Sequence, residues 1–494
     1  MGVVFRQSAK GTIITLIGAL IGFVSTFFII TKLLSPEEIG LTRVLVEAAT
    51  MIGGFALLAT QSSSVRYYPA FRTDDGKDGG FFKLLVTIPL VGFFLFACIY
   101  LIFKEPISNY FAASDGKESL FIKYYYLVIP LMLFIMYQTL MEVYCTLKQR
   151  VFIPKAIREV LLRLLLILCY LLYGLRHLSF TTFMGLFVAA YGIVAFLSYA
   201  YAIYLSPNTL KSKIQPIEPE LKKDFTNYTL FTVLSALGGS IISRFDIFMV
   251  SSQMGLNFSG IYTIAFFIVA VIEMPSRSIL AMTSPLVSDA LYQGDLNKTE
   301  ELFRKVSSQQ LLIGSLLFML IWLNIDFIFS IIPNSETYAT GKWVVFFLGL
   351  AKLVDLSFNF GNAILRYSRY YPWTLAYTII VMALTIVLNY YLIKRLGITG
   401  AAIATLITFV VSYAFQQIVI GAKLKIRVLN REMLWIILTL AVALALNNFL
   451  PSLHNLVLDA IYRSLICGVL SVALLYRLDS FQSILNEIKM IIRK

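Results

Sequence analysis

The chain has 494 residues and a formal net charge of +14; 59% of its residues are hydrophobic and only 14% are charged. Soluble domains carry about 25% charged residues, so this composition excludes an ordinary water-soluble protein. Apolar runs of roughly 20 residues instead recur along the chain, and each can cross a hydrocarbon core of ~30 Å as a helix. The sequence therefore predicts an all-α integral membrane protein.

About fourteen transmembrane helices are predicted in chain order. They cover residues 11–34, 40–62, 81–103, 121–145, 154–174, 180–205, 227–252, 258–280, 308–332, 341–363, 372–393, 398–421, 432–450 and 456–477. The first run is too long for the core of a signal peptide, so we expect an uncleaved first helix. Two further segments, 286–306 and 478–494, mix apolar and charged residues at helical spacing. This pattern predicts helices on the membrane surface, in contact with membrane lipids, with a solvated connector as the alternative.

The distribution of Lys and Arg among the connections predicts the orientation. With a cytoplasmic N-terminus, the inner segments hold 28 of these residues and the outer segments hold 8. Such an excess is typical of cytoplasmic loops, so both termini are predicted to be cytoplasmic. No nucleic acid partner is expected, because no basic cluster lies on a soluble module.

Weak self-similarity at a common sequence offset near 219 predicts an internal repeat. The stretches LLSPEEIGLTRV and QMGLNFSGIYTI place Gly40 and Gly260 at an offset of 220, and Pro154 and Pro372 have an offset of 218. Two lobes of six helices each would have the same topology, as in transporters that bind substrate between two halves. A duplicated bundle that transports nothing is the alternative. The predicted parts are a first six-helix lobe (1–205), a cytoplasmic linker (206–226), a second six-helix lobe (227–421), helices thirteen and fourteen (422–477) and an amphipathic cytoplasmic tail (478–494).

Enzymatic and metal chemistry find little support in the sequence. The four cysteines lie in apolar segments without CxxC spacing, and the two histidines, His177 and His454, are far apart. These features predict neither a disulfide framework nor a metal site. There is no GxxxxGK[ST] phosphate loop, so the chain is not expected to hydrolyse ATP. We expect no catalytic residues and no cofactor.

Four stretches resemble polysaccharide flippases of the multidrug/oligosaccharidyl-lipid/polysaccharide export (MOP) superfamily, in particular O-antigen (Wzx-type) exporters. They are LLSPEEIG, ISRFDIFMVSSQMGLNFSGIYTIAF, SPLVSDALYQGDLNKTEELFRK and LNYYLIKRLGITGAAIATLIT. The resemblance implies two bundles around a central cavity, with helices thirteen and fourteen outside the core. It also implies transfer of an undecaprenyl-pyrophosphate-linked oligosaccharide across a bacterial inner membrane, for O-antigen or capsule biosynthesis. Pathway partners would be a polysaccharide polymerase or glycosyltransferases.

A sugar–pyrophosphate headgroup cannot enter hydrocarbon, so charges inside the membrane are the first candidates for its binding residues. Each would cost about 2.5–3.5 kcal/mol at a lipid-facing helix centre, so we expect these side chains to face a cavity or each other. The candidates for substrate binding in a cationic cavity are Arg244, Lys352, Arg163, Arg43 and Arg66. The candidate carboxylates for coupling or gating are Asp246, Asp355, Glu273 and Glu47.

Local ion pairing is the alternative role for most of these charges. Arg244 is the first candidate, because Asp246 is two residues away on a different helix face and cannot neutralise it locally. A salt bridge from Arg244 to a carboxylate of another helix is the alternative. Arg66 sits at the cytoplasmic end of a predicted helix, where an orienting positive charge is the alternative. Spacings of three or four residues allow pairs between Arg163 and Glu159, Arg43 and Glu47, Lys352 and Asp355, and Arg277 and Glu273.

Three functions remain open at this stage. The favoured one is a flippase for lipid-linked oligosaccharide, working by alternating access through a cationic cavity. A cation-coupled multidrug exporter of the same superfamily is the alternative, although the two helices at 432–477 favour the lipid-linked substrate. A membrane polymerase or ligase of surface polysaccharide is the third, and the short predicted outer loops disfavour it.

Overall fold

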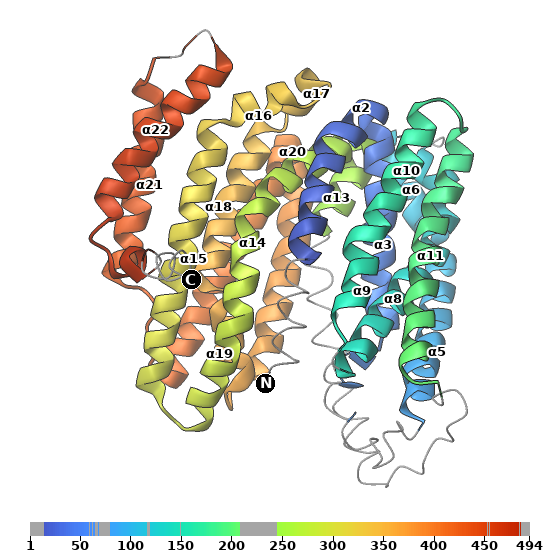
Figure 1. Ribbon diagram of the computed structural model, residues 1–494, viewed down its shortest axis with the longest axis horizontal. Coiled ribbons are helices and arrows are strands. Elements are labelled where there is room, and N and C mark those ends of the chain that lie inside the picture. The colour runs from blue at the N-terminus through green and yellow to red at the C-terminus, as the bar shows by residue number, and fades with distance from the viewer. Residues whose placement is uncertain are drawn as a thin grey trace. The chain divides into compact units, whose positions relative to one another are not determined.

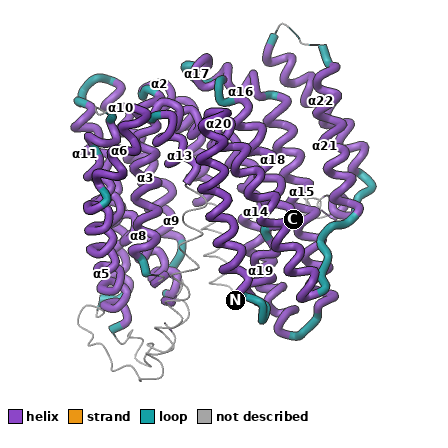
Figure 2. The backbone as a smooth tube through the Cα atoms, turned by 180° about the vertical axis from the view of Figure 1, so that it is seen from behind, coloured by secondary structure: helices purple, strands orange, loops and turns teal. Residues whose placement is uncertain are grey.

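The computed structural model describes residues 14–58, 60–61, 63–64, 68, 80–115, 119–148, 150–207, 245–451, 453, 455–483 and 485. This part of the chain is helical and contains no strand, as Figure 2 shows. The helices form two compact units, Met1–Gly260 and Ile261–Lys494. We describe each unit by itself.

The first unit is built around the helices α3, α8 and α11 (Figure 1). Helix α8 packs against both α3 and α11, while α5 covers α3 and α10 covers α11. The first span, Ile14–Leu33, includes the π-helical turn η1. The elements are η1 (Ser25–Ile30), α2 (Thr31–Leu33), α3 (Pro36–Ala56), α5 (Phe81–Ile102), α6 (Lys104–Asp115), α7 (Leu120–Lys123), η2 (Tyr125–Leu127), α8 (Val128–Leu147), α9 (Phe152–Ala156), η3 (Ile157–Leu161), α10 (Leu162–Gly174), α11 (Phe180–Leu205) and α13 (Phe245–Met254). Helix α14 (Leu256–Tyr292) begins in this unit and continues in the second.

The second unit is built around α18, which packs against α15 and α20. Helices α21 and α22 pack against each other and against α15, at one edge of this unit (Figure 1). Its elements after α14 are α15 (Leu296–Leu323), α16 (Ile325–Ile331), α17 (Ser335–Ala339), α18 (Lys342–Phe358), α19 (Phe360–Tyr367), α20 (Pro372–Leu424), α21 (Arg431–Phe449) and α22 (Leu456–Leu475). Helix α20 is two helices joined at Gly397, where φ is 62° and ψ is −146°.

The sequence SPEE at residues 35–38 forms the start of α3. Ser35 accepts a hydrogen bond from the Glu38 amide at 3.2 Å, and the Glu38 carboxylate accepts one from the Ser35 amide at 2.8 Å. This capping box, followed by Pro36 in the first helical turn, fixes where the helix begins. The second Glu38 oxygen accepts a hydrogen bond from the Tyr173 hydroxyl at 2.5 Å, which ties the start of α3 to α10.

Repeat-related residues meet where α3 and α14 begin. A Cβ on Gly40 would fall on the carbonyl of Leu256 and lie 3.1 Å from the amide nitrogen of Gly260. A Cβ on Gly260 would in turn fall on the carbonyl of Pro36. The four residues pair at one offset of 220, so the contact is reciprocal. Glycine is required at both positions, because the facing atoms are backbone.

Helix starts support the predicted repeat. The starts at Pro36 and Phe152 recur at Leu256 and Pro372, both at an offset of 220. The start at Phe180 recurs at an offset of 218, where α20 resumes after Gly397. The compact units differ from the predicted lobes, because the described part of helix seven, α13, belongs to the first unit. The lobe boundaries at 205 and 227 stay predictions.

Eleven helices in the described residues are long and apolar enough to cross a membrane. One of them, Pro372–Leu424, contains both predicted helices eleven and twelve. Predicted helix five is present as the continuous helical run α9–η3–α10. Most of predicted helix seven lies outside the described residues, so the count of fourteen stays a prediction.

The predicted surface helix at 286–306 is wrong. The structure divides this segment between the end of α14 and the beginning of α15, with a turn at 293–295 in which Gly294 has a φ of 73°. The 37 residues of α14 extend about 55 Å, well beyond a hydrocarbon core of ~30 Å. The charged residues therefore cover a helical hairpin that extends past the apolar span. The predicted tail helix lies mostly outside the described residues.

Candidate functional site

Two of the candidate cations, Arg244 and Arg66, lie outside the described residues. Asp246 is half-buried in the first turn of α13. The other candidates fall into clusters within each unit, and each cluster is described below.

Arg43 and Glu47 form the expected pair on α3. An Arg43 guanidinium nitrogen lies 2.5 Å from a carboxylate oxygen of Glu47. The Glu47 side chain is only 4% exposed, whereas that of Arg43 is 24% exposed. Tyr170 of α10 and Tyr191 of α11 are close enough to interact electrostatically with Arg43. The pair therefore has polar neighbours inside the bundle, as expected for an intramembrane charge.

A ladder of four charges joins α8 to the run η3–α10. Arg158 lies 2.5 Å from Glu142 of α8 and 2.9 Å from Glu159. Glu159 also lies 3.3 Å from Arg163, which is the expected pair four residues along. Arg163 donates a further hydrogen bond to the carbonyl oxygen of Gly18 in the first span. Two cations and two anions balance each other within this ladder.

Glycines let the first span approach this ladder closely. A Cβ on Gly18 would lie 2.7 Å from the Glu159 Cβ and 2.8 Å from its carbonyl oxygen, and a Cβ on Gly22 would fall on the Arg163 guanidinium. Small residues four apart commonly allow such close helix packing in membranes. π-helical turns lie on both sides, η1 in the first span and η3 beside the ladder.

We predict that Gly18→Ala is more destabilising than Gly22→Ala. The methyl group added at position 18 would meet backbone and Cβ atoms that cannot move independently, whereas the one added at position 22 would displace the end of a flexible side chain. Overpacking of this kind costs about 1–3 kcal/mol, and Gly18→Ala should lie at the upper end. Thermal unfolding in detergent measures both variants. Equal midpoints, or a lower midpoint for Gly22→Ala, would contradict the packing described here.

The second unit contains an ion pair between two helices. Lys352 of α18 lies 2.7 Å from Glu273 of α14, and their side chains are 19% and 28% exposed. Lys352 also interacts electrostatically with Asp355, as their spacing of three residues predicts. The side chain of Arg277 lies outside the described residues, so its pair with Glu273 stays a prediction. The contact between Lys352 and Glu273 joins α18 to α14, and it was not predicted from the spacing of charges along one helix.

Asp355 lies next to this pair and has a different partner. Its carboxylate accepts a hydrogen bond from the Tyr413 hydroxyl of α20, and it interacts electrostatically with both Lys352 and Glu273. Lys352, Glu273 and Asp355 thus form a charged cluster within the described part of this bundle. Proton or cation exchange is the chemistry that such a set can support.

One helical turn from Glu273 lies a cluster of uncharged polar side chains that was not predicted from the sequence. The Ser276 hydroxyl donates to the Gln310 side-chain oxygen at 3.2 Å, and the Asn359 amide reaches Ser276 at 3.5 Å. The remaining polar atoms, Gln310 Nε2 and Asn359 Oδ1, are buried and have no hydrogen-bond partner among the described residues. Water or a polar ligand would satisfy these groups. The sequence signal that could have found this cluster is the presence of uncharged polar residues, Ser276, Gln310 and Asn359, in otherwise apolar segments.

Comparison with known proteins identifies the fold. No family model matches the sequence. One curated relative, described as a probable low-salt glycan biosynthesis flippase (Agl15) of Haloferax volcanii, is 23% identical over 235 residues. That region is 46% of this chain and 49% of the relative, so the match spans about half of each protein.

Two solved structures cover most of the chain. The lipid II flippase MurJ, in an inward closed conformation, matches 97% of this chain and 100% of its own length with a TM-score of 0.70 and 15% identity. An inward-facing multidrug resistance MATE family transporter of the MOP superfamily matches 84% of this chain and 99% of its own length with a TM-score of 0.59 and 16% identity. The chain has the fold of these multi-pass membrane proteins. All three proteins are flippases or transporters, not enzymes.

Proposed function

We propose that this protein is a flippase that moves a lipid-linked oligosaccharide across a cytoplasmic membrane by alternating access. The observation that carries the proposal is the match to a lipid II flippase over 97% of the chain. The curated relative is described as a probable glycan biosynthesis flippase, which supports a glycan-carrying substrate for this protein as well. The specific cargo that we propose is an undecaprenyl-pyrophosphate-linked repeat unit for O-antigen or capsule, in a bacterial inner membrane with both termini cytoplasmic.

The share of this chain that each solved structure matches favours a flippase over a multidrug exporter. The segment from Arg431 onward makes up more than a tenth of the chain, so a match over 97% of the residues must extend into α21 and α22. The match to the MATE transporter covers 84%. A twelve-helix exporter needs no counterpart of these two helices, whereas the lipid II flippase fold accommodates them.

In this proposal the intramembrane cations bind the pyrophosphate. Arg43, Arg163 and Lys352 are each paired with a carboxylate, and each side chain keeps between 19% and 32% of its surface exposed. Pairing keeps these charges tolerable while no substrate is bound. A phosphate oxygen would then replace a carboxylate at the exposed edge of a guanidinium, whose planar donors suit phosphate geometry. Arg244 and Arg66 stay candidates on sequence grounds.

The carboxylates complete the proposed mechanism. Glu47, Glu273 and Asp355, with Asp246 as a further candidate, would take up the released cation charge or exchange a coupling ion as the protein changes between its two open forms. Glycosyltransferases or a polymerase of the same pathway would supply or consume the lipid-linked glycan.

Deletion of the gene, followed by analysis of lipid-linked intermediates, tests the function. A flippase predicts that complete repeat units accumulate on the cytoplasmic leaflet while surface glycan is lost. Truncated sugars would instead indicate an enzyme, and unchanged surface glycan with increased drug sensitivity would indicate an exporter.

Arg244 offers a more specific prediction. Because a guanidinium contact to pyrophosphate depends on charge, Arg244→Ala should abolish transport with normal expression, and Arg244→Lys should retain part of it. Surface glycan in the complemented deletion strain is the measurement. Full complementation by Arg244→Ala would remove this residue from the binding site.

A further inference from the structure

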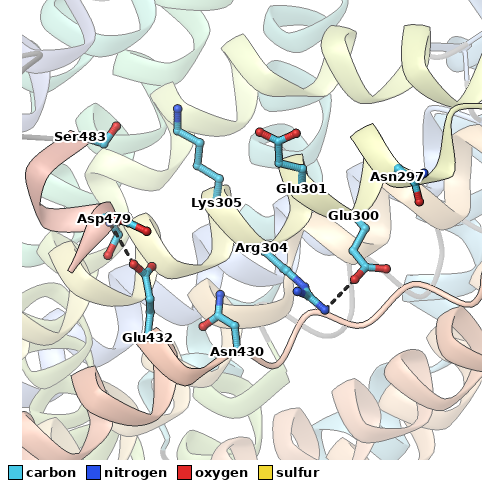
Figure 3. A pocket seen from close by; sticks show the side chains of 10 residues that line it. Asn297, Glu300, Glu301, Arg304, Lys305, Asn430, Glu432, Asp479 and Ser483 are labelled. Atoms are coloured by element: carbon cyan, nitrogen blue, oxygen red, sulfur yellow. Dashed lines mark hydrogen bonds and ion pairs between the residues drawn. The ribbon is translucent and has the colours of Figure 1, made fainter.

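A polar pocket of about 590 Å³ opens in the second unit, away from the intramembrane pairs. Figure 3 shows that its side chains come from three segments: the beginning of α15, the beginning of α21 and the residues that follow α22. The lining residues are Asn297, Glu300, Glu301, Arg304, Lys305, Asn430, Glu432, Asp479, Ser480 and Ser483. Four carboxylates therefore face two cations.

Hydrogen bonds hold the three segments together around this pocket. Arg304 lies 2.6 Å from Glu300 and donates to the carbonyl of Arg427 at 2.8 Å. Asn430 donates to Ser308 at 2.9 Å, which fixes the start of α21 against α15. Gln309 donates to Ser483 at 3.2 Å. The pocket is therefore a built part of the unit, and the Arg304–Glu300 pair belongs to its wall (Figure 3).

Other lining groups have no partner among the described residues. Lys305, Glu301 and Asp479 are exposed and make no hydrogen bond or ion pair there. Ser480 is only 5% exposed, yet its hydroxyl oxygen has no hydrogen-bond partner in the described part of the chain. A buried hydroxyl without a partner costs about 1–3 kcal/mol, so a group that enters the pocket would satisfy it. The pocket therefore has free binding capacity for both signs of charge.

Aromatic residues place the pocket at the level of lipid headgroups. Trp435 lies one turn into α21 and is 53% exposed, and Tyr476 directly follows α22 and is 56% exposed. Exposed Trp and Tyr at helix ends mark the membrane–water interface. Beyond them, α21 and α22 expose large apolar side chains such as Leu438 and Val469, where acyl chains would lie. By the distribution of Lys and Arg, this is the cytoplasmic side.

We propose that this pocket binds the headgroup of a zwitterionic phospholipid, and specifically an ethanolamine headgroup. Its ammonium would donate hydrogen bonds to the carboxylates of Glu432 and Asp479, and its phosphate would pair with Lys305, while Glu301 adds to the negative charge of the pocket. The buried Ser480 hydroxyl would donate to a phosphate oxygen. Choline cannot donate these hydrogen bonds, and an anionic lipid would meet an excess of two negative charges. This binding is independent of the proposed transport function.

A small cation alone fits less well. No group of three metal-ligating side chains gathers in the described residues. The pocket also offers Lys305 for a negative group, which a bare cation would not use. A headgroup with both signs of charge can use unpartnered groups of both signs, Asp479 and Lys305.

Lipid titrations of the purified full-length protein, followed by native mass spectrometry, test the proposal. One phosphatidylethanolamine should bind about tenfold more tightly than phosphatidylglycerol or phosphatidylcholine with the same acyl chains. The double variant Glu301→Gln/Asp479→Asn should lose this preference. Lys305→Ala should weaken binding of phosphatidylethanolamine without creating a preference for phosphatidylglycerol.

Lys298→Ala is the matched control. Lys298 lies in the first turn of α15, is exposed and does not line the pocket, so this variant should keep the lipid preference. Thermal unfolding in lipid-free detergent should be the same for all variants, because the substituted side chains make no hydrogen bond or ion pair among the described residues. Equal affinity of the wild type for the three lipids, or a preserved preference in the double variant, would overturn the proposal. Soluble glycerophosphoethanolamine competing at lipid-like concentrations would assign the pocket to a free metabolite headgroup and overturn the membrane source.

Discussion

Alanine at position 40 or position 260 is expected to prevent most of the protein from folding. In each case the new methyl group would fall on a backbone carbonyl, of Leu256 or of Pro36, which has no rotamer by which to move away. Overpacking costs about 1–3 kcal/mol when side chains can adjust, so a backbone collision should cost at least the upper value. That is a large fraction of the roughly 5–15 kcal/mol that stabilises a typical domain. Folded yield from the membrane and the thermal midpoint in detergent are the measurements.

The reciprocal geometry gives this prediction an internal control. Because Gly40 and Gly260 make the same contact, separating the helix starts for one alanine also makes room for the other. The double variant should therefore be less destabilised than the sum of the two single variants. Gly185→Ala is the external control, since no atom lies within 4 Å of its added methyl group. It should be neutral or stabilising by up to about 1 kcal/mol, as an alanine in a helix is. Additive losses, or a Gly185→Ala variant as damaged as Gly40→Ala, would refute the contact.

The lengths of the apolar runs, the common repeat offset and the spacing of charges were sufficient to predict much of the fold. Apolar length identified the spans, because a helix must satisfy its own backbone hydrogen bonds in lipid. The common offset identified the repeat, and the glycines that share it, Gly40 and Gly260, prove to face each other. The pairs Arg43–Glu47 and Arg163–Glu159 were predictable for the same reason: residues four apart on a helix are neighbours whatever the tertiary structure.

Contacts between helices were not predictable from one sequence. Lys352 forms an ion pair with Glu273, 79 residues away, and Asp355 accepts a hydrogen bond from Tyr413, 58 residues away. Spacing shows which side chains share a helix face but not which helix that face meets. The hairpin at the end of α14 was missed for a related reason, because charges at helical spacing look the same on a surface helix and on the extension of a membrane helix.

Removing Lys352 is expected to have the second large effect, on transport more than on folding. Lys352→Ala would remove the ammonium that interacts with the carboxylates of both Glu273 and Asp355. Breaking a fully buried pair costs about 3–5 kcal/mol, and this partly exposed pair should cost less. Because the proposed function uses this ammonium to bind phosphate, surface glycan should be lost even where the protein still folds. Complementation of the deletion strain and thermal unfolding measure the two effects separately.

A charge exchange distinguishes a binding role from a structural one. Lys352→Glu combined with Glu273→Lys restores one cation and one carboxylate between α14 and α18, so the thermal midpoint should recover. Transport should not recover if the position of the ammonium matters to the substrate. Lys342→Ala is the matched control: its partner Asp326 is 69% exposed, and a pair of that kind contributes about 0–1 kcal/mol. Full transport in the exchanged variant would show that Lys352 only balances charge, and would leave the other partly exposed cations, Arg43 and Arg163, to bind the pyrophosphate.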